Sequence, residues 1–302
     1  MKKIVSVSLG SSSRDHSYKT ELLGEEFEIS RIGTDGDIAK MEELFGELDS
    51  KVNAFGMGGG DIYMRPAGRT YIMKDPYKWA KSAPSKPVCD GAFLKAVLEP
   101  MIIDKLFDQG ILNPDQKTLV MTAVDRYCLA KSFVDRGSTC TFGDMAFSLD
   151  IPVAIRSLGM INFLSFLLMP VISRLPYHWL YPLGSKQNDP GSKPNRFFAW
   201  ADVVAGDLHY IWKAMPPDMN GKIIVTNTTT EKNRKEFAKR GVKALATFTP
   251  NMNGRTFGAN VIEAMICGIT GKHPMETSVE EYKDIINKLG IEPNIIDLTK
   301  ED

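Results

Sequence analysis

Residues 118–142, TLVMTAVDRYCLAKSFVDRGSTCTF, are the stretch that decides the fold. The apolar run at 118–121 predicts a strand. Residues 125–136 predict a helix that ends at Gly137, because glycine is favoured just past a helix C-terminus. A second strand is expected at 139–142. A strand, a helix and a strand in this order need a crossover connection, and such connections build parallel sheets.

The same alternation of strands and helices extends in both directions along the chain. Residues 3–9, with the β-branched pattern KIVSVSL, predict the first strand. Further strands and helices are predicted at 25–32, 36–49, 52–56, 91–109, 202–207, 207–214, 222–226, 230–240, 244–248, 258–270 and 278–289. The expected fold is therefore α/β, with an N-terminal α/β domain followed by a Rossmann-like, doubly wound parallel sheet that carries a helical insertion.

The length of 302 residues exceeds the usual size of one domain. We expect an N-terminal substrate-type domain over 1–90 and a connecting helix over 91–116. The Rossmann-like domain is expected over 117–275, with its apolar insertion at 151–200, and a C-terminal helix and tail over 276–302.

Composition excludes some classes of function. Lys plus Arg and Asp plus Glu both number 37, so the net charge is zero, and a dedicated nucleic-acid-binding protein is not expected. The four cysteines lie far apart without a Cys-x-x-Cys pair, which indicates free thiols in a reducing compartment and no metal site. The apolar part of the first residues is too short for a signal peptide, so a cytoplasmic location is expected.

Residues 158–175, LGMINFLSFLLMPVISRL, form the most apolar segment of the chain, interrupted by Pro170. Our preferred interpretation is a helix that is buried or forms a groove. One alternative is a helix lying on a membrane surface, with a peripheral contact through 158–181. A membrane-spanning helix is marginal because a span needs about 20 apolar residues.

The turn after the strand at 118–121 is a candidate ligand site, because open α/β sheets bind ligands at the carboxyl ends of their strands and helix N-termini favour anions. Arg126 could bind a phosphate or carboxylate, and Asp144 lies at the spacing expected of a ribose-binding acid. The alternatives are helix capping by Asp125, a surface arginine and a loop aspartate. The residues predicted to bind a cofactor are Thr122, Asp125, Arg126, Asp144, Thr226, Asn227 and Thr249.

Two glycine-rich turns follow strands in the N-terminal part. The glycine–serine turn at 10–16 could cradle an anion with amides and hydroxyls, and the turn at 56–61 lets a backbone approach a ligand closely. Ordinary tight turns are the alternative for both. Residues predicted to bind a small anionic substrate are Ser11, Ser12, Arg14, Gly58, Gly59, Asp61 and Arg255.

Three residues are candidates for acid–base chemistry. His16 is one of four histidines and could act as acid or base, although a lone histidine is more often structural. Asp90 and Lys95 flank the start of the connecting helix, where the interdomain cleft is expected, and the alternative is an ordinary surface lysine and an aspartate at the helix N-terminus.

Five segments together resemble the bacterial and archaeal family labelled quinate 5-dehydrogenase, over nearly the whole chain. They are VSVSLGSSSRDH at 5–16, AFGMGGGDIY at 54–63, VMTAVDRY at 120–127, LPYHWLYPLGSKQ at 175–187 and GRTFGANVIEAM at 254–265. The resemblance implies an NAD(P)-dependent oxidoreductase acting on a quinate- or shikimate-like hydroxy compound. Shikimate-type enzymes use a lysine–aspartate pair for proton transfer, for which Lys95 and Asp90 are the candidates.

The sequence departs from the dehydrogenase pattern at the turn 122–127. It reads TAVDRY where the dinucleotide fingerprint is Gly-x-Gly-x-x-Gly, whose glycines allow the pyrophosphate to approach the backbone. Two alternatives therefore stay open. One is a non-catalytic or lipid-associated ligand-binding protein, and the other is an enzyme using a different nucleotide-derived ligand such as S-adenosylmethionine. Assembly into a homo-oligomer is also left open.

Overall fold

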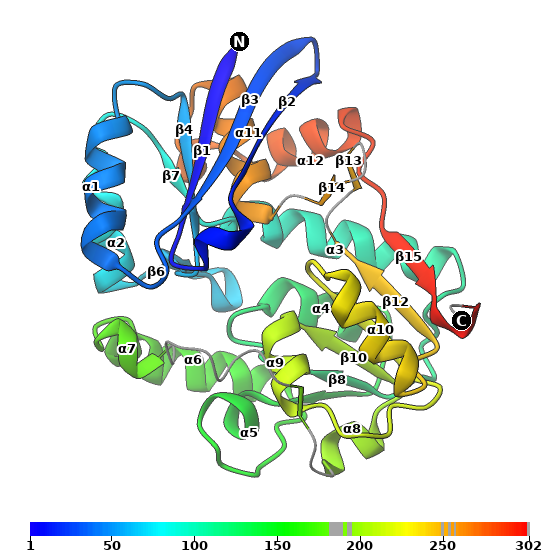
Figure 1. Ribbon diagram of the computed structural model, residues 1–302. Coiled ribbons are helices and arrows are strands. Elements are labelled where there is room, and N and C mark those ends of the chain that lie inside the picture. Colours follow the sequence, from blue (N-terminus) through cyan, green and yellow to red (C-terminus); the bar gives the residue numbers. More distant parts are fainter. Residues whose placement is uncertain (181–189, 192–194, 249–250, 253–254, 257, 301–302) are drawn as a thin grey trace.

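The computed structural model of the chain describes residues 1–180, 190–191, 195–248, 251–252, 255–256 and 258–300. These residues form two main sheets with helices around them (Figure 1). The predicted α/β class with parallel sheets is confirmed.

The first sheet has the strand order β2-β3-β1-β4-β7. Its parallel strands are β1 (Lys2–Ser8), β3 (Glu25–Gly33), β4 (Ala54–Gly58) and β7 (Val88–Cys89). The chain runs from β1 to β3 on one side and then to β4 on the other, so β1 and β4 flank the point where the winding direction reverses. β1 is buried on both faces, which explains its unbroken apolar pattern.

Sequence analysis missed the edge strand β2 (His16–Leu22), which pairs antiparallel with β3. Helices α1 (Ile38–Leu48) and α2 (Lys74–Ala80) pack against each other beside this sheet. The N-cap of α1 is Asp37, whose side chain accepts a hydrogen bond from the Lys40 amide.

The second sheet has the strand order β15-β12-β11-β10-β8-β9. Its parallel strands are β8 (Thr118–Val120), β9 (Cys140–Phe142), β10 (Val203–Gly206), β11 (Ile223–Thr226) and β12 (Ala244–Thr247). Here the winding direction reverses between β8 and β10. The last strand, β15 (Asn294–Asp297), was not predicted and pairs antiparallel with β12.

Helices follow the strands of the second sheet as a crossover fold requires. They are α4 (Tyr127–Asp135), α5 (Asp144–Ser148), α8 (Arg196–Trp200), α9 (Leu208–Ala214) and α10 (Glu231–Lys239). The smaller elements are η1 (Ser12–Arg14), β5 (Tyr63–Met64), η2 (Pro66–Gly68), β6 (Tyr71–Ile72), β13 (Asn251–Met252), β14 (Arg255–Thr256), η4 (Pro274–Glu276) and η5 (Leu298–Lys300).

Three passages of the chain join the two halves. Helix α3 (Ala92–Asp108) runs between them and packs against α4, α11 and α12 (Figure 1). Helix α11 (Ala259–Thr270) then returns to the first half and packs on β1 and β4. The third passage follows α12 (Val279–Lys288) and leads back to β15 in the second sheet. The range 117–275 therefore includes a helix that covers the first sheet, although the predicted domain boundaries themselves stay a prediction.

The apolar insertion forms α6 (Leu158–Ile172) and α7 (Tyr177–Leu180). One face of α6 is buried and the opposite face is exposed, so the preferred interpretation of a buried helix applies to one face only. Among the described residues, no helix combines the length and apolar character that crossing a membrane requires.

The insertion with α6 and α7 extends from the half that contains the second sheet and is hydrogen-bonded to the half that contains the first sheet. The Ser173 carbonyl accepts a hydrogen bond from the Lys74 amide at 2.8 Å, and Asp75 accepts one from the Tyr177 amide at 2.9 Å. The Tyr177 hydroxyl donates to the carbonyl of Gly59. We call residues 157–180 the strap, because they bridge the two halves.

Candidate functional site

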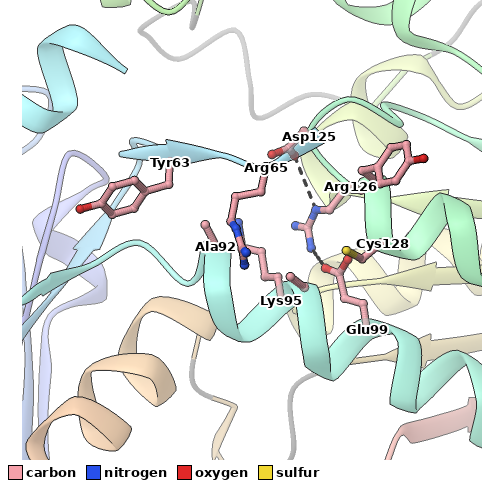
Figure 2. A pocket seen from close by; sticks show the side chains of 10 residues that line it. Tyr63, Arg65, Ala92, Lys95, Glu99, Asp125, Arg126 and Cys128 are labelled. Carbon is pink, nitrogen blue, oxygen red and sulfur yellow. Dashed lines mark hydrogen bonds and ion pairs between the residues drawn. The ribbon is translucent and has the colours of Figure 1, made fainter. Parts of the chain in front are cut away.

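A cavity at the start of α3 is lined by residues of α3, by Tyr63 and Arg65, and by Asp125 and Arg126 after β8 (Figure 2). Asp61 follows β4 of the first sheet, and Arg126 and Asp207 follow β8 and β10 of the second. Lys95 and Glu99 lie one turn apart on α3, between the two sheets. Five charged side chains from both halves therefore gather at one place.

Arg126 is the centre of this cluster. Its guanidinium hydrogen-bonds Glu99 on one side and Asp207 on the other, the latter at 2.6 and 3.0 Å. Asp125 is 3.5 Å away from Nε, and the Arg126 and Glu99 side chains are each only 2% exposed. Burial opposes the charge on Arg126, but the carboxylates of Asp207 and Glu99 outweigh it and hold the arginine pKa above its usual value.

This arrangement changes the predicted role of Arg126. Its guanidinium already binds two carboxylates and lies close to a third, so it is not open to an incoming phosphate or carboxylate. The same contacts act on Asp207, where burial is opposed and outweighed by Arg126 and Lys95, so that the Asp207 pKa falls well below its usual value. Arg126 and Asp207 thus form a permanently charged pair.

Lys95 pairs with Asp61 across the cleft. The Nζ–Oδ1 distance is 3.6 Å, and the two side chains are 19% and 23% exposed. Burial and the nearby Arg126 oppose the charge on Lys95, yet the carboxylates led by Asp61 raise its pKa above the ordinary value. A raised pKa keeps the Lys95 ammonium group charged near neutral pH, so it can donate hydrogen bonds, and its part in proton transfer stays a prediction.

Asp125 lies beside this pair and borders the cavity. Burial and the charge of Asp61 raise its pKa well above the usual range, while Lys95 acts in the opposite direction. A raised pKa favours the protonated carboxyl, which can donate as well as accept a hydrogen bond.

Asp90, predicted to share proton transfer with Lys95, binds the backbone of two neighbouring segments. Its Oδ2 accepts hydrogen bonds from the amides of Ile62 and Tyr63 at 2.6 and 2.8 Å, and its Oδ1 accepts one from Ala92 at 2.9 Å. Both oxygens are thus engaged in fixing β5 and the first turn of α3.

Glu263 of α11 performs a similar task and was not predicted as part of the site. It accepts hydrogen bonds from the amides of Gly91 and Leu94, both at 2.8 Å, and so caps the N-terminus of α3. Burial and the neighbouring Asp90 raise the Glu263 pKa to about 7. The only signal in the sequence was an acid on the apolar face of a helix, which needs a partner when it is buried.

Asp144, predicted to bind a ribose at the turn after β8, binds the backbone of that turn. Its carboxylate accepts hydrogen bonds from the amides of Ala123 and Val124 at 2.9 and 2.8 Å. In a dinucleotide-binding turn, the acid contacts ribose and the backbone approaches the pyrophosphate. Here the acid and the turn bind each other. Thr122 in the same turn is buried, and its hydroxyl has no hydrogen-bond partner among the described residues.

The polar residues after β11 support Asp207. The Asn227 amide donates to Asp207 Oδ1 at 2.5 Å, and its oxygen accepts from the Leu208 amide at 3.2 Å. The Thr226 hydroxyl donates to the carbonyl of Gly206 at 2.8 Å. Thr249 lies outside the described residues. Thr226 and Asn227 therefore hold neighbouring strand ends together and orient the carboxylate.

The first turn does not border the cavity. Its hydrogen bonds run to the segment around β3, where the Ser12 amide donates to Asp35 at 2.8 Å and Arg31 donates to the Ser11 carbonyl at 2.9 Å. The His16 ring lies 2.9 Å from the carbonyl of Arg14, on the edge strand β2. Ser11, Ser12, Arg14 and His16 are absent from the cavity lining among the described residues.

The glycines of the second turn allow close packing of the protein against itself. A Cβ on Gly58 would lie 2.6 Å from the Ser8 hydroxyl, and Gly59 has a φ of +80°. The Gly59 carbonyl is bound by Tyr177 of the strap. Arg255 belongs to β14, whose backbone pairs with β13, and its side chain is outside the described part.

The cavity itself is small. It offers about 20 Å³ to the centres of water-sized spheres, which is room for about one water molecule. Arg65 also lines it, with its guanidinium 4.2 Å above the ring of Phe93 and its buried Nε without a hydrogen bond in the described part of the chain. Arg65, Glu99, Asp207 and Glu263 are the site residues that sequence analysis did not identify. The described residues contain no His, Cys, Asp and Glu cluster able to hold a metal ion.

Several solved structures share low-level likeness with the chain. A galactofuranose-binding protein is 11% identical, with 96% of this chain and 99% of that chain covered and a TM-score of 0.35. A sugar ABC transport substrate-binding protein from Bordetella parapertussis is 11% identical over 100% and 92%, with a TM-score of 0.36. An ABC solute-binding protein from Burkholderia multivorans is 11% identical over 97% and 98%, also with a TM-score of 0.36. Likeness at this level assigns no ligand, and no curated protein sequence matches the chain.

The resemblance to quinate dehydrogenases, and the NAD(P)-dependent oxidoreductase function that it implied, are wrong. Residues 3–90 match the family model described as Domain of unknown function (DUF8753), and residues 93–298 match Domain of unknown function (DUF8754). Neither description names a dehydrogenase. The glycine-free turn closed by Asp144 gives the physical reason. The second model spans more than half of the sequence, and the chain belongs to the family described as Domain of unknown function (DUF8754).

Proposed function

We propose that this protein is a binding protein that takes a small, uncharged, polyhydroxylated molecule between its two sheets. The observation that supports this most is the charged cluster at the facing strand ends. The side chains of Asp61, Lys95, Asp125 and Asp207 are only 15–23% exposed, and Lys95 and Asp125 line the cavity. Ligands in open α/β sheets bind outside the carboxyl ends of the strands, where the winding direction reverses.

The charge balance favours an uncharged guest. The cluster has three cations, Lys95, Arg65 and Arg126, and three carboxylates, Asp61, Asp207 and Glu99. Burial and the charge of Asp61 raise the pKa of Asp125, which favours the neutral form of this carboxyl. A neutral guest leaves this balance unchanged, whereas a buried ion without a partner is costly. The predicted anionic substrate is therefore the less favoured choice.

Hydroxyl groups fit the chemistry of these side chains. Asp125 in the cavity wall can accept a hydrogen bond and, when protonated, donate one, Lys95 donates hydrogen bonds, and a hydroxyl can do both. A molecule with several adjacent hydroxyls can therefore satisfy donors and acceptors from both halves at once. Since the cavity has room for about one water, such a guest needs the two halves to move apart before it enters.

Analysis of small molecules retained by the gently purified full-length chain tests the proposal directly. A neutral sugar or polyol released on denaturation is the expected result. A retained nucleotide would instead favour the alternative of a nucleotide-derived ligand such as S-adenosylmethionine.

Thermal unfolding with a panel of neutral sugars and polyols, sugar acids and amines tests the charge argument. A neutral compound at 100 times its Kd stabilises the folded state by about 2.7 kcal/mol. Asp125→Asn, which alters the cavity wall, is expected to reduce this shift. Asp135→Asn is the matched control, because Asp135 lies on the exposed side of α4 in an ion pair with Lys131. Stabilisation by sugar acids or amines alone, or by none of the compounds, would contradict the proposal.

A further inference from the structure

The outer face of α6 exposes several large apolar side chains. Phe163 and Phe166 are each 59% exposed, Leu167 is 57% exposed and Val171 is 62% exposed. Trp179 of α7 adds a side chain that is 69% exposed. Large contiguous apolar surfaces are uncommon on soluble proteins and usually mark an interaction site.

The fold holds this face outward. Ile161, Ser165 and Met169 recur at every fourth position and are buried on the opposite side of α6. The helix begins at the N-cap Ser157, and its far end is attached to the first half through Ser173. The apolar face is therefore exposed because the opposite face of α6 is packed against the protein and both ends of the helix are attached.

Positive charges lie next to the apolar face. A groove of about 550 Å³ runs between β6 and the end of α6, and Lys74 and Arg174 line it together with hydroxyl-bearing side chains. Arg174 lies in the turn directly after α6, and its guanidinium donates a hydrogen bond to the Pro170 carbonyl at 3.2 Å. No acidic residue in the described part of the chain lines this groove.

A third cation touches the apolar surface directly. The guanidinium of Arg69 lies 4.9 Å from the ring centroid of Phe166. Arginine and lysine near exposed aromatic and aliphatic side chains are the combination found in segments that lie on membrane surfaces.

We propose that the face formed by α6 and Trp179 docks onto the surface of a bilayer that contains anionic phospholipids. The apolar side chains enter the boundary between head groups and acyl chains. Lys74, Arg69 and Arg174 contact the phosphates of the head groups. This inference does not depend on the small molecule proposed for the cleft.

The charges favour a lipid surface over a second copy of the chain. In a two-fold dimer the same patch meets itself, which would bring the three cations of each copy near those of the other. An anionic bilayer neutralises them instead. The helix lies on the membrane in this arrangement and does not cross it, which agrees with the absence of a spanning helix among the described residues.

Flotation of the full chain with vesicles tests the proposal. Vesicles of phosphatidylcholine with about 30% phosphatidylglycerol resemble an anionic membrane, and pure phosphatidylcholine vesicles serve as the lipid control. We expect the protein to float with the anionic vesicles, to remain behind with the neutral ones, and to be released by high salt.

Substitutions at exposed positions separate the apolar and the electrostatic contributions. Phe163→Ser combined with Leu167→Ser is expected to abolish flotation, with Val279→Ser on α12 as the apolar control. Arg174→Glu is expected to lower the partition coefficient more than about fivefold, the effect of one basic residue. Lys232→Glu on α10 is the charge control.

Three outcomes would overturn the proposal. The first is a lack of flotation with anionic vesicles, and the second is flotation that the α6 substitutions leave unchanged. The third is a dimer in sedimentation experiments without lipid that F163S/L167S dissociates, since this would show that a second copy occupies the face. Circular dichroism of each variant checks that the fold is retained.

Discussion

Arg126 and Asp207 are joined by two hydrogen bonds, from Nε to Oδ2 at 3.0 Å and from Nη2 to Oδ1 at 2.6 Å. They follow β8 and β10, the two strands between which the winding of the second sheet reverses. Open α/β sheets bind their ligands at that point. In this protein an internal ion pair occupies it, so a ligand meets a site whose charges are already largely neutralised.

Replacing Arg126 tests the importance of this pair for stability. Arg126→Met leaves Glu99 and Asp207 without their buried partner and is expected to cost about 3–5 kcal/mol in the free energy of unfolding. Urea denaturation measures the loss. Arg136→Met is the control, because Arg136 forms more exposed ion pairs with Asp104 and Asp108, for which a cost of about 1 kcal/mol or less is expected. Equal losses in both variants would contradict the central role of Arg126.

Asp90→Asn tests whether Asp90 anchors the backbone. The carboxylate accepts three amide hydrogen bonds with its two oxygens, whereas asparagine has one accepting oxygen and an amide group that would face a donor. A loss of about 1–3 kcal/mol in the free energy of unfolding is expected. Asp37→Asn is a matched control, because asparagine caps a helix as well as aspartate does. Unchanged stability of Asp90→Asn would show that the three amides do not need the carboxylate.

The raised pKa of Glu263 predicts a pH dependence of stability. In the unfolded chain the carboxyl releases its proton near its usual pKa of 4.5, while in the folded protein it holds the proton up to a pKa of about 7. The folded state therefore binds more protons in this window. The contribution of Glu263 to stability is present below pH 4.5 and is lost as the pH rises through 7.

Comparison of the protein with Glu263→Gln isolates this effect, because glutamine does not titrate. The stability of the unaltered protein relative to the variant is expected to fall between pH 5 and pH 8 by an amount on the order of 2 kcal/mol. Urea denaturation at both pH values measures it, with the exposed Glu280→Gln as control. A difference that does not vary with pH would exclude a Glu263 titration in this range.

Tyr177→Phe tests the attachment of the strap. The hydroxyl donates to the Gly59 carbonyl, and its loss is expected to cost about 1 kcal/mol. Because the strap bridges the two halves, amide hydrogen exchange is expected to become faster over 158–180 and to stay unchanged in β1. The same exchange rates in the protein and the variant would show that the remaining contacts hold the strap without the hydroxyl.

Local patterns were sufficient to predict most of the central elements. The run KIVSVSL predicted β1, and the β-branched and apolar strands of the second sheet were predicted for the same reason. The strand β2 was missed because it is an edge strand with alternating polar side chains and no apolar run. The strand β15 was missed because its four residues, NIID, include only two apolar side chains.

The residues of the site could be predicted only in part. Arg126 was identified from its place at the end of a strand, but its partners Glu99 and Asp207 are 27 and 81 residues away in the sequence. The same holds for Asp90 and Glu263, whose hydrogen bonds were not visible in the sequence. Asp144 has the spacing of a ribose ligand, yet it binds the turn itself.

The sequence by itself determined the alternation of strands and helices and the parallel sheets, because these depend on short-range patterns of apolar residues, glycine and capping side chains. Only the tertiary structure decided which charges neutralise one another and which face of α6 meets solvent. Both depend on side chains that are brought together by the packing of distant segments. The same arginine can bind an anionic ligand or pair with carboxylates of the protein itself, and the residues that surround it in space decide between the two.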